Sequence, residues 1–226
     1  MIKAVIFDMD GVLVDTEDTV AQATIDMFDE LYGAKVKKED FLPFVGTGAK
    51  KYIMGVAEKY RITVNMEKSL GKREENFGKI ASLGGIRAFP GAVECIREAK
   101  RLGLKTAIAT SSHKSILEIT LKGAGINIKD FNTITTAEEC KNVKPDPEIF
   151  LLTAKKLNLS PKDCLVIEDS PAGIKAGKKG GFFVVGVAST FPKSKLHEAD
   201  FVVGNLKELI IKDLVSKSQL QAISSK

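Results

Sequence analysis

The sequence predicts an α/β fold, a Rossmann-like parallel sheet into which a helical segment is inserted. Short, nearly continuous apolar runs of strand length recur along the chain, which is typical of strands covered on both faces. Helical repeats of apolar residues separate most of these runs. Strands that alternate with helices form parallel sheets through crossover connections, so the pattern predicts a sheet layered between helices.

Six runs predict strands: Ile2 to Phe7, Leu104 to Ala109, Asn132 to Thr136, Cys164 to Ile167, Phe182 to Val187 and Phe201 to Val203. The helical patterns between them are exemplified by the three-residue steps of Val93, Ile96, Ala99 and Leu102. Residues 206–215 predict a last helix, and we expect the polar stretch 216–226 to be frayed.

Residues 17–88 interrupt this alternation, because they show helical periodicity and no convincing strand. They fall between the first and second predicted strands, and loops at such places tolerate insertions best. The sequence therefore predicts two domains, a core of residues 1–16 plus 89–226 and a helical domain of residues 17–88.

The composition excludes several classes of protein. The 226 residues include 34 Lys and Arg against 29 Asp and Glu, a net charge of +5, and 44% are hydrophobic, which is enough to form a core. No window approaches the ~18 consecutive apolar residues of a membrane helix. No clustered basic face is evident, and such a face is the usual mark of a nucleic-acid binder. We expect neither a membrane nor a nucleic acid as a partner.

The three cysteines and two histidines bear on redox compartment and metal chemistry. The cysteines are far apart, with no CxxC, which argues against a disulfide framework or a zinc site. The first apolar run breaks at Asp8, too early for a signal-peptide core. We therefore expect a cytoplasmic protein whose metal site, if any, uses oxygen ligands.

Polar clusters follow four of the predicted strands: Asp8 with Asp10, Thr110 to Ser112, Lys144, and Glu168 with Asp169. In an open parallel sheet, ligands bind beyond the carboxyl ends of the strands. The four clusters are therefore expected to meet at one edge.

Three carboxylates at this edge, those of Asp8, Asp10 and Asp169, predict a metal site. Like charges this close repel unless a cation lies between them. Oxygen ligands with few histidines suit Mg²⁺, which binds through one or two carboxylates, water and substrate phosphate. An isolated Asp is more often a cap or turn residue, but the combination favours the metal.

The same residues fit phosphoryl transfer. One Asp attacks phosphorus and becomes an aspartyl-phosphate, while the second protonates the leaving alcohol and then deprotonates water. Mg²⁺ and Lys144 neutralise the developing charge, and Thr110 orients a phosphoryl oxygen. Thr110, Ser111 and Ser112 offer hydroxyls and backbone donors for an anion, although taken alone they also fit a helix N-cap. Of the three, we expect Thr110 and Ser111 to contact the phosphate. No P-loop is present.

The motifs resemble those of the haloacid dehalogenase (HAD) superfamily. Residues 7–16, FDMDGVLVDT, are similar to its opening signature, and Thr110, Lys144 in KPDP and residues 168–173 resemble its other three motifs in order. The resemblance implies a HAD-like fold with Asp8 as nucleophile and Asp10 as general acid/base. It also implies that Mg²⁺ is bound by Asp8, the backbone carbonyl of Asp10 and Asp169, with Glu168 in the outer shell.

The helical insert resembles the cap of the beta-phosphoglucomutase and phosphoglycolate phosphatase-like branch. There the cap closes over the site, so Thr16 and residues 88–91 are implied as hinges. Asp10 argues against a dehalogenase, because true haloacid dehalogenases lack the second Asp. Beta-phosphoglucomutases carry a His where this chain has Val20, and an Arg in a cap loop that corresponds here to residues 46–50, which contain no Arg.

These departures favour a Mg²⁺-dependent phosphatase that hydrolyses a small phosphorylated metabolite, a phosphate monoester of sugar or polyol type. A phosphosugar mutase is the alternative, and a non-catalytic binding module is a third. In the cap we expect Gly46, Lys50 and Arg73 to contact substrate, although Lys50 and Arg73 also fit solvated helix charges. We expect a monomer.

Overall fold

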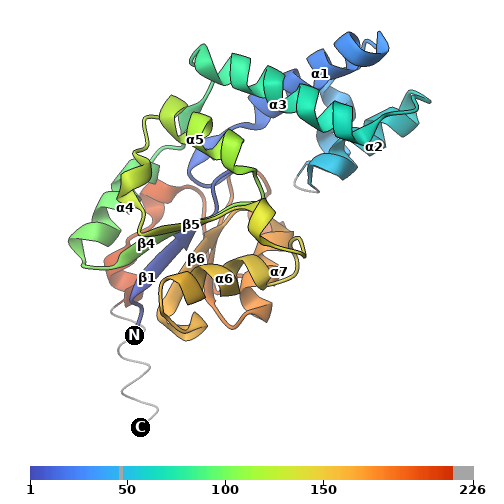
Figure 1. Cartoon of the computed structure of the whole chain (residues 1–226). Coiled ribbons are helices and arrows are strands. Elements are labelled where there is room, and N and C mark those ends of the chain that lie inside the picture. The colour runs from blue at the N-terminus through green and yellow to red at the C-terminus, as the bar shows by residue number, and fades with distance from the viewer. Residues whose placement is uncertain (46–47, 216–226) are drawn as a thin grey trace.

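The computed structural model describes residues 1–45 and 48–215 and has a six-stranded parallel sheet at its centre (Figure 1). The strand order is β5-β4-β1-β6-β7-β8. The strands are β1 (Ala4–Phe7), β4 (Lys105–Ala109), β5 (Thr133–Thr135), β6 (Cys164–Glu168), β7 (Phe183–Val187) and β8 (Phe201–Val203). All six predicted strands are present, most of them slightly shorter than predicted, and the predicted α/β fold class is confirmed.

Helices cover both faces of the sheet. One face carries α4 (Ala92–Arg101) and α5 (Lys114–Gly123), and the other carries α6 (Glu148–Lys156) and α7 (Pro171–Lys179). Successive side chains of a strand point to opposite faces. Val5 and Phe7 of β1 therefore join the first hydrophobic cluster, and Ala4 and Ile6 join the second. All four are fully buried, which explains the continuous apolar run of the sequence.

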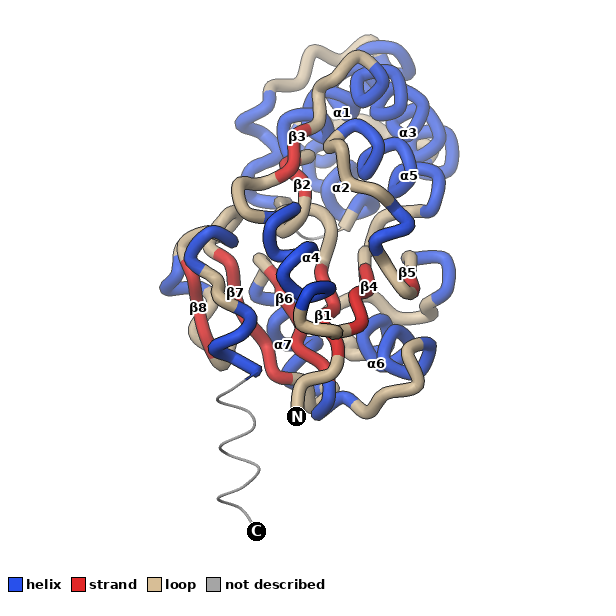
Figure 2. Tube along the Cα trace, turned by 90° about the vertical axis from the view of Figure 1, so that its left-hand side faces the viewer, coloured by secondary structure: helices blue, strands red, loops and turns tan. Residues whose placement is uncertain are grey.

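The helical segment lies beyond one end of the sheet (Figure 2). It consists of α1 (Glu17–Tyr32), a 3₁₀ helix (Lys38–Phe44), α2 (Ala49–Lys59) and α3 (Met66–Ser82). The chain enters and leaves it through a short antiparallel ribbon of β2 (Val14–Asp15) and β3 (Arg87–Ala88). The prediction that residues 17–88 contain no strand is therefore wrong at residues 87–88, because two residues are too few to show an alternating pattern.

The helical segment has two differently packed halves. Its outer half has a cluster of its own, in which Phe41 packs against Tyr52 of α2 with ring centroids 4.7 Å apart. Its inner half shares the main cluster of the core, to which Phe77 and Ala81 of α3 belong. A Cβ on Gly78 would lie 3.6 Å from Ile119 of α5, so α3 and α5 pack closely there. The division into two domains stays a prediction.

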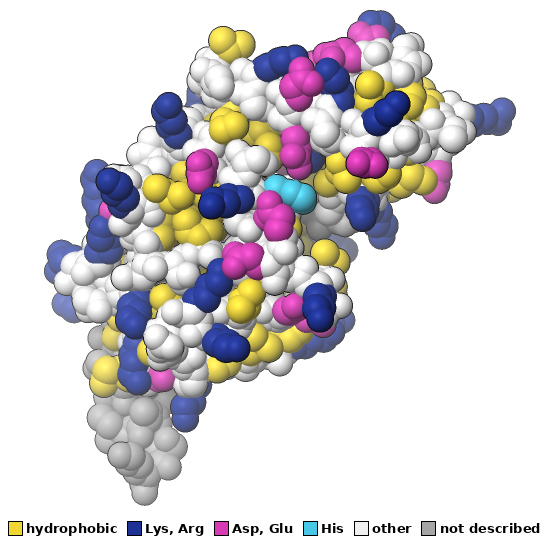
Figure 3. Space-filling model, in the orientation of Figure 1, with side chains coloured by type: hydrophobic (Ala, Val, Ile, Leu, Met, Phe, Trp, Pro, Cys, Tyr) yellow, Lys and Arg dark blue, Asp and Glu magenta, His cyan; other side chains and the backbone are white. Residues whose placement is uncertain are grey.

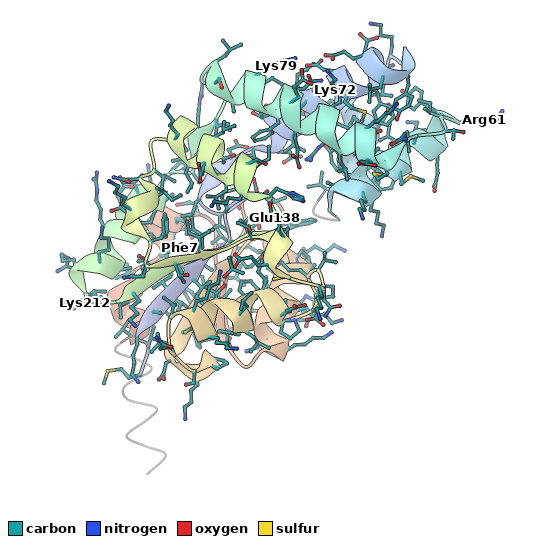
Figure 4. All side chains as sticks on the ribbon, viewed as in Figure 1. Phe7, Arg61, Lys72, Lys79, Glu138 and Lys212 are labelled. Atoms are coloured by element: carbon teal, nitrogen blue, oxygen red, sulfur yellow. The ribbon has the colours of Figure 1, made fainter. Side chains whose placement is uncertain are left out.

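One exposed contact also joins the two parts. His113 Nδ1 of the core lies 3.8 Å from an oxygen of Glu74 on α3 and 3.5 Å from an oxygen of Glu138. Figure 4 shows Glu138 on the core side of this junction.

The predicted helix at residues 206–215 is interrupted. A 3₁₀ turn (Leu206–Glu208) is followed by Leu209 in an extended conformation, and residues 211–215 are helical again. The carboxylate of Glu98 on α4 accepts the backbone N–H groups of Ile211 and Lys212, which supplies the second segment with its N-terminal cap. The predicted frayed stretch 216–226 lies outside the described residues. Of the described helices, none is long and apolar enough to cross a membrane.

Candidate active site

Asp8 and Asp10 lie on the tight turn that follows β1. The N–H of Asp8 still bonds to the carbonyl of Ile167 on β6, so its position is fixed by the sheet. The N–H groups of residues 12–14 all point to the carbonyl of Met9. The turn separates the two carboxylates and lets them face different neighbours.

Gly11 makes this turn possible for two reasons. Its φ of +83° lies in a region that side chains disfavour. A Cβ at this position would also come within 2.1 Å of Asp169 Oδ2 and 2.7 Å of Thr190 Oγ1. The glycine therefore allows the turn to pack directly against Asp169.

Lys144 follows β5, in the loop before α6, and reaches into the centre of the site. Its Nζ donates to Asp8 Oδ1 at 2.5 Å and to Glu168 Oε1 at 2.6 Å. The ammonium also lies 4.9 Å from the ring centre of Phe150. All three charged side chains are at least nine-tenths buried. Lys144 is therefore a buried cation of this site and not an exposed surface lysine.

Glu168 and Asp169 arrive from the end of β6. The second oxygen of Glu168 accepts bonds from the N–H and hydroxyl of Ser170, the residue that caps α7 as its Ser-Pro sequence predicts. Ligand oxygens of Asp8, Glu168 and Asp169 all lie within 4.8 Å of one another. We call these three residues the acid cluster.

The acid cluster has more negative charge than its one buried cation, Lys144, can balance. The pKa of Asp8 is raised to about 8, mainly because of burial, which Lys144 opposes and to which the charges of Glu168 and Asp10 add. Burial, Glu168 and Asp8 likewise raise the pKa of Asp169 well above its usual range. Burial disfavours the ammonium of Lys144, but Asp8 and Glu168 outweigh it and raise its pKa. Buried carboxylates in excess of their cations are characteristic of a metal site.

The donor set of the acid cluster fits Mg²⁺. It consists of carboxylate oxygens, which are hard donors, without sulfur or imidazole. Asp8 and Asp169 are the predicted ligands that the structure brings together. The side chain of Asp10 is not part of the acid cluster, whose third carboxylate is that of Glu168. The assignment of the metal ligands, with Asp10 contributing its backbone carbonyl, stays a prediction.

Asp10 is held instead by hydroxyl groups. Its Oδ1 accepts a bond from Thr16 at 2.6 Å, and its Oδ2 accepts one from Ser112 at 2.7 Å. Thr110 Oγ1 is 3.5 Å from Oδ2 and accepts the N–H of Ser112 at 3.0 Å. These contacts orient one carboxylate beside the acid cluster but outside it.

Ser112 is a site residue that sequence reasoning did not select. The prediction chose Thr110 and Ser111, but Ser111 is exposed whereas Ser112 reaches Asp10. The hydroxyls also do not cap α5, whose N-cap is His113 without a side-chain cap. Thr110 is fully buried, as its place directly after β4 requires.

The residues of the helical segment that were predicted to contact substrate differ in their burial and position. Arg73 of α3 is half-buried, and the charge of Asp10 acts on it across the interface with the core. Lys50 is exposed in the first turn of α2. Gly46 lies outside the described residues. Tyr52 of α2, which the sequence analysis did not consider, is buried and close enough to Arg73 to be affected by its charge.

Comparison with known proteins identifies the family to which the chain belongs. A family model described as haloacid dehalogenase-like hydrolase matches residues 5–187. The chain belongs to this family. The predicted superfamily and hydrolase class are confirmed.

Relatives in this family differ in length and name. The protein SUPPRESSOR OF QUENCHING 1, chloroplastic, of Arabidopsis thaliana is 37% identical over 200 residues, 88% of this chain, but the match spans only 19% of the plant protein. A phosphorylated carbohydrates phosphatase of Thermotoga maritima is 35% identical over 187 residues, covering 79% of this chain and 82% of that protein.

A solved structure supports the fold over the whole length. The beta-phosphoglucomutase of Clostridium difficile has a TM-score of 0.83 and 27% identity, and the alignment covers 99% of this chain and 100% of that one. The architecture, helical segment included, is therefore shared with that enzyme.

Proposed function

We propose that this haloacid dehalogenase-family hydrolase is a Mg²⁺-dependent phosphatase of a small sugar- or polyol-type phosphate monoester. One observation supports this most strongly: two carboxylates two residues apart have entirely different partners. Asp8 is bound to Lys144 within the acid cluster, and Asp10 is bound to Thr16 and Ser112. Different surroundings for two neighbouring carboxylates are what separate nucleophile and acid/base roles require.

In this proposal Asp8 is the nucleophile. Its carboxylate oxygen forms a bond to phosphorus as the bond between phosphorus and the leaving oxygen breaks, giving an aspartyl-phosphate on Asp8. Asp10 acts as the general acid and gives a proton to the leaving oxygen. Asp10 then takes a proton from the water that attacks phosphorus, which releases phosphate and restores Asp8.

The remaining residues control charge and position. Mg²⁺, when held by Asp8, Asp169 and the backbone carbonyl of Asp10, supplies positive charge that favours an ionised Asp8 and offsets the charge of the phosphoryl group. Lys144 adds a fixed positive charge, and Glu168 holds Lys144 in place. Thr110 is placed to orient a phosphoryl oxygen.

The helical segment, residues 17–88, is proposed as the cap over this site. It is tethered to residues 1–16 and 89–226 by the β2–β3 ribbon, and Thr16 and residues 88–91 adjoin this ribbon on its two sides. Hinges at these points would let the cap exclude water during transfer. The monomeric state, the cytoplasmic location and the absence of a nucleic-acid partner stay predictions.

A phosphosugar mutase is the second candidate. The likeness to the beta-phosphoglucomutase structure favours it, and the core chemistry would be the same. Val20 stands where those mutases carry a His, which favours hydrolysis over transfer back to a sugar.

The test is turnover of a panel of phosphate monoesters, sugar and polyol phosphates included, with millimolar Mg²⁺. The wild-type protein is expected to release phosphate, and Asp8→Asn is expected to lose at least about 10³-fold in kcat/KM. Net phosphate release without conversion of beta-glucose 1-phosphate to glucose 6-phosphate supports the phosphatase, and isomerisation without net release supports the mutase. Equal activity of wild type and Asp8→Asn contradicts both.

A further inference from the structure

The turn after β7 carries two hydroxyl groups, those of Ser189 and Thr190, at the edge of the sheet where the site lies. β7 runs parallel to β6 and beside it, so this turn follows its strand next to Asp169. The turn is held on both sides, because the N–H of Ala188 donates to a carbonyl of β8 at 3.0 Å and Phe191 packs against the second hydrophobic cluster. A fixed backbone therefore presents the two hydroxyls.

Thr190 reaches the carboxylate of Asp169. Its hydroxyl forms a side-chain hydrogen bond with this carboxylate, and because an ionised carboxylate can only accept, the hydroxyl is the donor. Both groups lie against Gly11, where an added Cβ would be 2.1 Å from Asp169 Oδ2 and 2.7 Å from Thr190 Oγ1. Lys144 holds the other two members of the acid cluster. Thr190 thus does for Asp169 what Lys144 does for its neighbours.

Ser189 reaches the turn that carries Asp10. Its Oγ donates to the carbonyl oxygen of Gly11, a residue 178 positions away in the chain. The N–H of Gly11, which shares a peptide unit with the carbonyl of Asp10, donates to the carbonyl of Val14 at 3.0 Å. The planar peptide units on both sides of Gly11 are thus held, and the orientation of the Asp10 carbonyl is fixed with them.

These contacts differ from those that a turn makes for its own stability. Hydroxyls of turn residues commonly bond to backbone groups of the same turn. The hydroxyls of Ser189 and Thr190 instead reach across to the segments that follow β1 and β6. Each of these two segments supplies a proposed ligand of Mg²⁺, the carbonyl of Asp10 in one and the carboxylate of Asp169 in the other.

We propose that Ser189 and Thr190 are positioning residues for the metal ion. Thr190 orients the carboxylate of Asp169. Ser189 orients the turn after β1 and with it the carbonyl of Asp10. A hydroxyl suits this task because it is neutral, so it holds a carboxylate oxygen and leaves the negative charge to the cation. This inference rests on the proposed function, from which it takes the ion, and it adds two residues outside the four motifs to the site.

The test measures the Mg²⁺ affinity of metal-free protein by calorimetry, with the fold checked by circular dichroism. Partners that orient metal ligands typically contribute about 10–100-fold to metal affinity. Thr190→Val, which removes the hydroxyl and keeps the volume, is therefore expected to weaken Mg²⁺ binding at least about 10-fold. Thr190→Ser keeps the hydroxyl and is expected to restore most of the affinity. Ser189→Ala is expected to weaken binding by a smaller factor, because Ser189 acts through the backbone.

Ser160→Ala is the matched control. The hydroxyl of Ser160 also holds a carboxylate, that of Asp163 at 2.9 Å, but it lies before β6, at the opposite end of the sheet. This variant is expected to bind Mg²⁺ as the wild type does. In turnover, Thr190→Val is expected to raise the Mg²⁺ concentration needed for half-maximal rate, which a residue that only stabilised the fold would not do.

Two results would overturn the inference: Mg²⁺ binding by Thr190→Val as tight as by the wild type, or binding by Thr190→Ser as weak as by Thr190→Val. If Thr190→Val does not fold, Thr190→Ala takes its place in both comparisons. Wild-type affinity in Ser189→Ala would overturn the role of Ser189. Failure of the phosphatase proposal looks different, since the wild-type protein would then bind Mg²⁺ but release no phosphate from any compound.

Discussion

The two sides of the proposed site differ in how completely their polar groups are paired. On the core side, Asp8, Lys144 and Glu168 bind one another, and Asp10 is held by two hydroxyls. On the side of the helical segment, the hydrogen bond that the side chain of Arg73 makes to a described residue uses Nε, which donates to Thr24, and Lys50 is exposed. The space-filling view shows the molecule hollowed between these two parts, with hydrophobic side chains along the edge of the helical segment (Figure 3).

This difference indicates that the two sides of the proposed site have different roles. The core side is preorganised, because most of its polar side chains are already held by hydrogen bonds to one another before any substrate arrives. The side of the helical segment leaves donors for the ligand to satisfy, which is what selects among substrates. The comparison predicts large losses from core substitutions and selective or small losses from substitutions in the helical segment.

The largest effect is expected from Lys144→Met. Removing the ammonium leaves Asp8, Glu168 and Asp169 without their buried cation, and breaking a buried ion pair costs about 3–5 kcal/mol. Urea unfolding with a chelator at pH 8, where more of these carboxylates are ionised than at pH 5, measures this loss. The loss should be smaller at pH 5. A stability equal to that of the wild type at pH 8 would show that the core side is not held by this pair.

The contribution of Asp40, in the helical segment, to the free energy of unfolding depends on pH with the opposite sign to that of Asp8. Hydrogen bonds from Lys59 and Tyr60 lower the pKa of Asp40 to about 2, so its contribution is present above about pH 4 and disappears as the pH falls through 2. The pKa of Asp8 is raised to about 8, so without metal its contribution is complete below about pH 4 and disappears as the pH rises through 8.

Melting temperatures between pH 2 and 9 in a chelator separate these two effects. Asp40→Asn is expected to lower the melting temperature at pH 7 by roughly 2–6 °C. It is also expected to make the melting temperature less dependent on pH in the acid range. Asp8→Asn is expected to flatten the alkaline side. Asp29→Asn, at an exposed pair with Lys35, is the control and should change neither. A profile in which Asp40→Asn alters only the alkaline side would contradict this assignment.

Ser112→Ala tests the role of the hydroxyl groups that donate hydrogen bonds to Asp10. Losing one hydrogen bond to a charged group is expected to lower kcat/KM about 10-fold, which is about 1.4 kcal/mol. Ser111→Ala is the matched comparison, since the exposed neighbour makes no contact with Asp10. A greater loss from Ser111→Ala would favour the prediction from sequence over the geometry.

The smallest effect is expected at the exposed junction of the two parts. His113→Gln removes the contacts with Glu74 and Glu138, and exposed ion pairs contribute at most about 1 kcal/mol. The melting temperature should therefore change by less than roughly 4 °C. A larger drop would mean that this contact, and not the packing of α3 on α5, joins the helical segment to the core.

The sequence was most informative where chemistry follows directly from a strand. Asp8, Thr110 and Glu168 each stand at or just after the end of a buried apolar run, and parallel strands bring such ends together. Lys144 was selected by its motif, and its burial between two carboxylates appears only in the structure. The sequence thus predicted the sheet and most of the core side of the site.

Other features depend on geometry that spacing does not encode. Whether Ser111 or Ser112 turns toward Asp10 is set by the path of the loop after β4. Asp10 leaves the acid cluster because of the turn at Gly11, and Glu168 enters it because of its bond to Lys144. The position of Arg73 depends on how α3 packs against α1, which a pattern of charges along one helix cannot show.

Binding of Mg²⁺ measured by calorimetry tests the central claim most directly. The wild-type protein is expected to bind one ion per chain, and Asp169→Asn to lose at least about 10-fold in affinity because the acid cluster loses one charged ligand. Asp40→Asn, the same change in the helical segment, should bind the ion as the wild type does. Undiminished binding by Asp169→Asn, or weakened binding by Asp40→Asn alone, would contradict the account of the acid cluster as the metal site.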